Sequence, residues 1–154
     1  MAGPATAAGE PTELTRRLAG LVTAAPGRPM RTSYAPVDGT PIGEVPVCTP
    51  DDVVEAVRGA RAAQAEWAPL SVRERSRVFL RFHDLVLEWQ AELLGLVQLE
   101  TGKSRIDAFE EVADVAMTAR YYARTAPRHL RPARRRGLVP VLTRVTERRV
   151  PKGV

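Results

Sequence analysis

The triplet Gly102-Lys103-Ser104 has the residue types that end a phosphate-binding loop, in which backbone amides and a lysine hold phosphate groups. That loop also needs a glycine five positions before Gly102, and the residue there is Val97. A predicted helix, and not a strand, precedes the triplet. We therefore interpret Gly102 as the stop of one helix and Ser104 as the N-cap of the next.

Nucleophiles and bases are few. Cys48 is the one cysteine in the sequence and precedes a predicted helix, but no histidine is close enough in sequence to activate it, so we expect it to pack. His83 precedes Asp84, and side chains of adjacent helical residues do not face each other. We expect His83 and His129 to be surface or interface residues. We assign no catalytic, cofactor-binding or metal-ligating residue.

Paired carboxylates occur once, as Glu110-Glu111 with Asp114 on a predicted helix. Such a group can transfer protons or hold a metal ion. Arg105 and Arg120 lie within one or two helical turns, so we expect a solvated face on which these acids pair with cations.

The basic residues are concentrated at the end of the chain. The 154 residues contain 23 Lys+Arg and 18 Asp+Glu, a formal net charge of +5. Residues 128–154 hold nine of the basic residues and one acid, Glu147. The cluster Arg134-Arg135-Arg136 could contact phosphate groups, but no aromatic residue follows Pro127 to stack on a base. We do not expect a nucleic-acid partner.

Helix-start and helix-stop residues organise the middle of the chain. Thr12–Ala25 predicts a short docking helix. Thr49-Pro50 opens a helix that ends near Pro69, and Ser71 with Glu74 opens a long one to about Leu99. That second stretch is longer than an average helix, so we expect a break near Gln90 to Glu92. Ser104 opens a third main helix, which ends by Pro127. Their predicted apolar faces include Val53, Val78, Phe82, Trp89, Ile106 and Phe109.

Two segments predict strands. Arg31–Pro36 and Pro41–Cys48 flank Asp38-Gly39, a dipeptide typical of a tight hairpin turn. Val141–Val150 is rich in Val and Thr and predicts a strand after a basic loop. The fold class is α+β, with a hairpin, three main helices and a C-terminal strand. We divide the chain into residues 1–30 (tail and short helix), 31–127 (hairpin arm and helices) and 128–154 (basic loop and strand).

Composition excludes several classes. One cysteine forbids an internal disulfide and fits a reducing compartment, so we expect a cytoplasmic protein. No apolar run is long enough to span a membrane. The first ten residues lack the basic and apolar regions of a secretory signal.

The order of the motifs resembles the N-terminal region of aldehyde dehydrogenases. The motifs are Ala35-Pro36-Val37-Asp38-Gly39, Ile42-Gly43-Glu44-Val45-Pro46, Thr49-Pro50-Asp51-Asp52-Val53, Leu99-Glu100-Thr101-Gly102-Lys103, Glu110-Glu111-Val112 and Tyr121-Tyr122-Ala123. The match runs from about Arg31 to Val154, and the Glu-Thr-Gly-Lys form is closer to the succinate-semialdehyde dehydrogenase branch.

This resemblance implies the N-terminal part of an α/β enzyme that oxidises an aldehyde to a carboxylic acid with NAD or NADP, through a thiohemiacetal. It implies a homo-oligomer in which Thr143 to Val150 forms a strand used in oligomerisation. The family's catalytic and cofactor-contacting motifs come after the point matching Val154, so none of them is carried over to a residue here. We therefore expect the 154-residue chain to be an inactive fragment that binds no cofactor alone.

A second class stays open. The chain could be a small helical binding module whose basic C-terminal segment meets an anionic or nucleic-acid partner.

Overall fold

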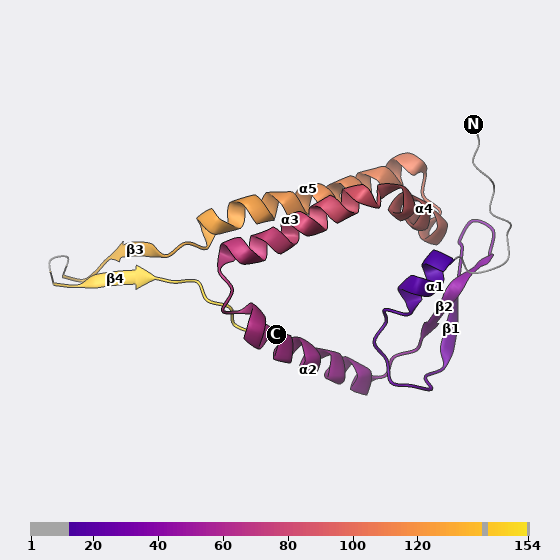
Figure 1. The fold of residues 1–154 in the computed structure, drawn as a ribbon, viewed down its shortest axis with the longest axis horizontal. Helices are drawn as coiled ribbons and strands as arrows, with labels where there is room; N and C mark the ends of the chain where they lie inside the picture. Colours follow the sequence, from indigo (N-terminus) through magenta and orange to yellow (C-terminus); the bar gives the residue numbers. More distant parts are fainter. Residues whose placement is uncertain (1–12, 140–141, 154) are drawn as a thin grey trace. The chain divides into compact units, whose positions relative to one another are not determined.

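The structure is a computed structural model that describes residues 13–139 and 142–153. The elements, in chain order, are α1 (Glu13–Ala19), β1 (Met30–Tyr34), β2 (Pro41–Pro46), α2 (Pro50–Trp67), α3 (Val72–Glu88), α4 (Gln90–Thr101), α5 (Arg105–His129), β3 (Ala133–Arg136) and β4 (Arg144–Glu147) (Figure 1). The α+β prediction is confirmed. Thr12, Val141 and Val154 lie outside the described residues.

The chain forms two compact units. One contains the residues up to Gly59 together with Gln90–Glu111, and the other contains Ala60–Trp89 together with the residues from Val112 on.

Local signals account for most helix ends. At the start of α3 the Ser71 hydroxyl accepts a hydrogen bond from the Glu74 amide at 3.2 Å, and the Glu74 carboxylate accepts one from the Ser71 amide at 2.7 Å. This capping box satisfies two amides that the helix leaves unpaired. Trp89 ends α3 with φ −98° and ψ 14°, so the predicted break falls one residue before the expected segment.

Two helix bounds differ from the predictions. The helix predicted over Thr12–Ala25 ends at Ala19. Helix α5 passes through Pro127 and ends at His129. A proline in a last turn removes only one backbone hydrogen bond, and the Leu130 amide still donates to the Ala126 carbonyl at 2.8 Å.

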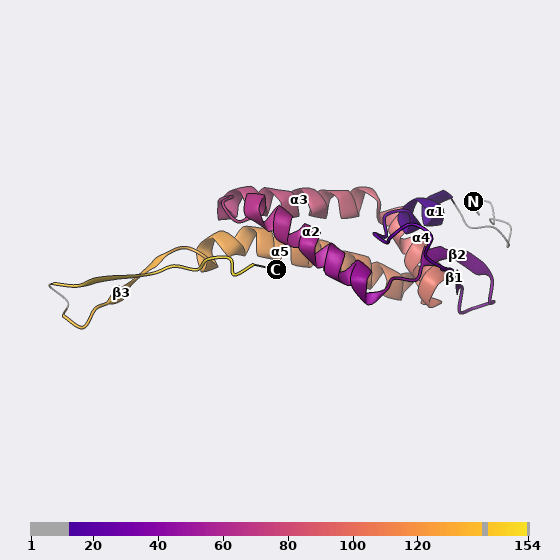
Figure 2. The same ribbon diagram turned by 90° about the horizontal axis from the view of Figure 1, so that it is seen from below.

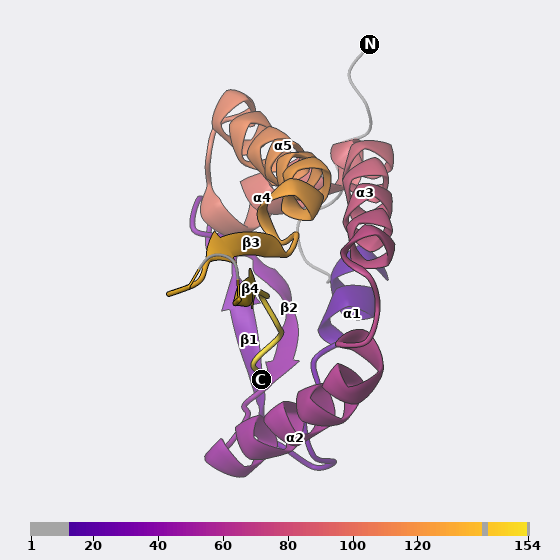
Figure 3. The same ribbon diagram turned by 90° about the vertical axis from the view of Figure 1, so that its left-hand side faces the viewer.

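In the first unit, β1 and β2 pair antiparallel, with Arg31 opposite Val45 and an irregularity between Ser33 and Tyr34. The turn is longer than the predicted tight turn, since the Ala35 amide bonds to the Thr40 carbonyl at 2.8 Å. Helix α1 lies against β2 (Figure 3). The side chain of the buried Thr15 faces Gly43, where an added Cβ atom would lie 3.6 Å from the Thr15 Cβ atom, an ordinary van der Waals distance.

In the second unit, α3 and α5 run antiparallel (Figure 1), and the β3–β4 hairpin extends from the end of α5 (Figure 2). The buried side chains of α5 within this unit are small and recur every three or four positions: Val112, Ala116, Ala119 and Ala123.

The predicted apolar faces are only partly right. Val53, Phe82 and Ile106 are 58%, 47% and 73% exposed, and Val78, Trp89 and Phe109 are also exposed. Small residues of α5 are buried instead, and many large apolar side chains are exposed among the described residues. No helix among the described residues is long and apolar enough to cross a bilayer.

Candidate functional site

Asp52, in the first turn of α2, is a buried charged side chain with five hydrogen-bond donors around it. Arg28 donates to it through Nε at 2.9 Å and Nη2 at 3.1 Å. The Ala25 amide (3.0 Å), the Thr49 amide (2.7 Å) and the Thr49 hydroxyl (3.0 Å) supply the others. Its side chain is 6% exposed. With all its acceptor sites used, this carboxylate fixes the chain before α2 and is not free to react.

These donors hold the pKa of Asp52 well below its ordinary value, the Arg28 hydrogen bonds contributing most and the Thr49 and Ala25 amides next. The Thr-x-x-Asp spacing was a signal for the Thr49 amide bond. Nothing in the sequence indicated that Arg28 and Ala25, which lie more than twenty residues before Asp52, would donate the other hydrogen bonds to its carboxylate.

The Gly102-Lys103-Ser104 segment forms a helix stop and a helix start, as predicted. Gly102 has φ +70°, and the Ser104 hydroxyl accepts the Asp107 amide at 3.2 Å. Lys103 pairs with Glu111. The lysine and the Asp107 amide are thus bound to protein groups, and the Ser104 hydroxyl also donates to the Asp107 carboxylate at 2.8 Å.

The Gly102-Lys103-Ser104 segment therefore does not form the cradle of a phosphate-binding loop. We derive no step through NAD or NADP from it.

His83 and Asp84 contradict the prediction that they do not meet. The His83 Nδ1 atom lies 2.9 Å from the Asp84 Oδ1 atom. The short Asp side chain can fold back along the helix toward its neighbour, so sequential adjacency did not exclude contact. Within the described part of the chain, no hydroxyl or thiol bonds to His83, so the pair lacks a nucleophile to activate.

Neither Cys48 nor His129 contacts a catalytic partner among the described residues. The prediction that Cys48 packs is wrong, because Cys48 is exposed, with its Sγ atom 3.9 Å from the carbonyl oxygens of Thr23 and Pro46. The His129 Nε2 atom lies 3.4 Å from the Arg128 Nη2 atom. In residues 13–139 and 142–153, no three His, Cys, Asp or Glu side chains gather as a metal site would require.

The acidic edge of α5 is solvated as predicted, but its partners differ. Glu111 pairs with Lys103, whereas Arg105 donates to Gln98 at 3.1 Å. The Thr118 hydroxyl contacts Asp114 at 3.5 Å. The loop before α5 carries Lys103 back over the helix, which the helical spacing of charges could not indicate.

The segment predicted as a basic loop contains strand β3. Arg134, Arg135 and Arg136 lie opposite Thr146, Val145 and Arg144 of β4. Glu147 pairs with Arg135 at 2.7 Å and with Arg149 at 3.3 Å. A Cβ atom on Gly137 would overlap the Thr143 side chain, so the close approach of Thr143 requires a glycine here. The arginine run carries no strand signal in its own sequence, and it is extended where it pairs with β4.

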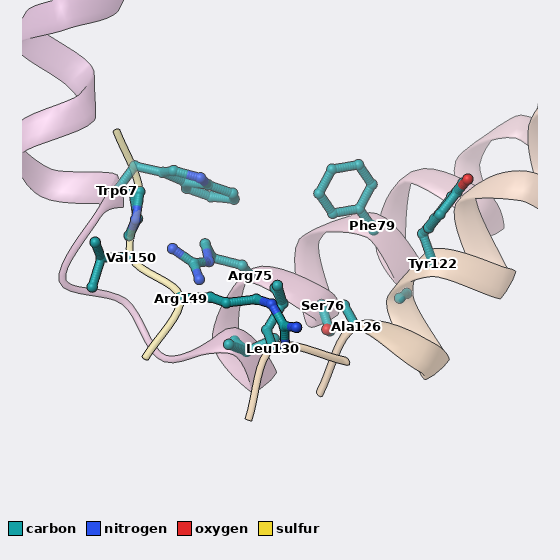
Figure 4. A pocket seen from close by; sticks show the side chains of 12 residues that line it. Trp67, Arg75, Ser76, Phe79, Tyr122, Ala126, Leu130, Arg149 and Val150 are labelled. Atoms are coloured by element: carbon teal, nitrogen blue, oxygen red, sulfur yellow. The ribbon is translucent and has the colours of Figure 1, made fainter. Parts of the chain in front are cut away.

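The second unit contains a hollow of about 360 Å³ between the end of α2, α3, α5 and the segment after β4. In Figure 4 the side chains of Arg75 and Arg149 lie between Trp67 on one side and Phe79 and Tyr122 on the other. No pattern in the sequence indicated this hollow, because its walls come from four separate segments.

The model of the aldehyde dehydrogenase family matches residues 23–154. The protein named "Putative succinate-semialdehyde dehydrogenase (NADP(+)) 2" of Mycobacterium ulcerans is 42% identical over 127 residues, which are 82% of this chain and 24% of that protein. The protein of the same name from Mycobacterium tuberculosis H37Rv is 41% identical over 139 residues, 90% of this chain and 27% of that protein.

Solved structures share the fold. An NAD-dependent aldehyde dehydrogenase from Sinorhizobium meliloti matches with a TM-score of 0.69 and 33% identity, over 77% of this chain and 24% of that one. A succinate-semialdehyde dehydrogenase from Burkholderia pseudomallei matches with a TM-score of 0.70 and 25% identity, over 75% of this chain and 24% of that one. This chain spans about a quarter of the length of the curated relatives it matches. It belongs to the aldehyde dehydrogenase family, as the motif order predicted.

Proposed function

We propose that this chain is the N-terminal part of an NAD(P)-dependent aldehyde dehydrogenase that oxidises succinic semialdehyde to the carboxylic acid. The observation that carries the proposal is the 42% identity over 127 residues to a protein named for succinate-semialdehyde and NADP(+). In this proposal residues 31–127 contribute the hairpin arm and helices of the cofactor-binding domain. The enzyme works in the cytoplasm, which the single cysteine supports.

The exposed apolar side chains also support this proposal. Phe82, Phe109 and Met117 are 47%, 48% and 62% exposed. Burying such side chains is favourable, and a stable globular protein normally covers most of them. A larger enzyme would bury them against its remaining elements.

Activity provides the test. The purified 154-residue chain is expected to form no NADPH or NADH from succinic semialdehyde, because it spans only about a quarter of the length of its curated relatives. The protein encoded by the complete reading frame is expected to reduce NADP with succinic semialdehyde faster than with malonic semialdehyde. Steady NADPH formation by the 154-residue chain would contradict the first expectation. A complete protein without aldehyde oxidation would contradict the proposal itself.

We also propose that Thr143 to Val150, which contains β4, joins subunits of a homo-oligomer. Two-stranded sheets leave both outer edges with unpaired amides and carbonyls, and a second subunit can pair with them. Val145→Pro, which removes an amide from β4, is expected to lower the molar mass measured by light scattering for the complete protein. An unchanged mass would reject this segment as the contact.

A further inference from the structure

We draw no further inference here: the strongest candidate, the hollow between the end of α2, α3, α5 and the segment after β4, is an open, unpartnered apolar surface in a chain that spans about a quarter of the length of its curated relatives, and nothing in the structure shows what covers it.

Discussion

Asp52→Asn should destabilise the first unit more than the replacement of any exposed acid in that unit. The substitution keeps the shape of the side chain but removes the charge that accepts two hydrogen bonds from Arg28, at 2.9 and 3.1 Å. It also places an amide N–H group among donors, leaving at least one donor unpaired in a site that is 6% exposed. We expect the melting temperature to fall by several degrees.

The matched control is Asp51→Asn. Asp51 precedes Asp52 in the same helical turn and is exposed, so its replacement removes the same charge near the same helix end without breaking the shell around Arg28. Only a small change is expected from the helix dipole. Equal melting temperatures for the two variants would show that the Arg28 contacts do not stabilise the fold.

The same carboxylate makes stability depend on pH. Because Arg28 and the Thr49 and Ala25 amides lower the pKa of Asp52 in the folded chain, the unfolded chain binds the proton more readily. Its contribution to the free energy of unfolding is therefore present above the ordinary aspartate pKa of about 3.9 and is lost as the pH falls below it. The difference in stability between the parent chain and Asp52→Asn should accordingly shrink between pH 6 and pH 3, as measured by urea unfolding.

Replacing two glycines of the first unit by alanine should change stability in opposite directions. Gly102 has φ +70°, and a Cβ atom there would lie 3.1 Å from the Val37 Cγ2 atom and 3.3 Å from the Pro36 Cγ atom. Left-handed backbone costs a non-glycine residue roughly 1–2 kcal/mol. Gly102→Ala should therefore lower the free energy of unfolding by about that amount, with the tight contact adding to it.

Gly95→Ala is the comparison. Gly95 lies inside α4, and a Cβ atom there meets nothing within 4 Å. Alanine is favoured over glycine in a helix interior by about 0.8–1.0 kcal/mol, so the chain should become more stable. Urea unfolding of both variants measures the two effects. Stabilisation by Gly102→Ala would contradict the role of Gly102 as the residue that ends α4.

Much of the fold and the family followed from local signals. Ser71 with Glu74, Gly102 and Ser104 each act on neighbours within a few residues, so their positions in the sequence were enough to place the starts of α3 and α5 and the end of α4. Asp38-Gly39 likewise indicated the hairpin, although the longer turn depends on the Thr40 contact with Ala35. The order of these signals along the chain identified the family.

Tertiary structure decided what depends on distant partners. The arginine run is a strand where β4 pairs with it, and the buried Asp52 accepts hydrogen bonds from Arg28, which lies 24 residues away in the sequence. Lys103, and not Arg105, pairs with Glu111. The hollow beside Arg75 has walls from four segments, and no short-range pattern encodes such a meeting. Caps and glycines act through neighbours in sequence, whereas ion pairs, strand pairing and cavities require chain segments to come together in space.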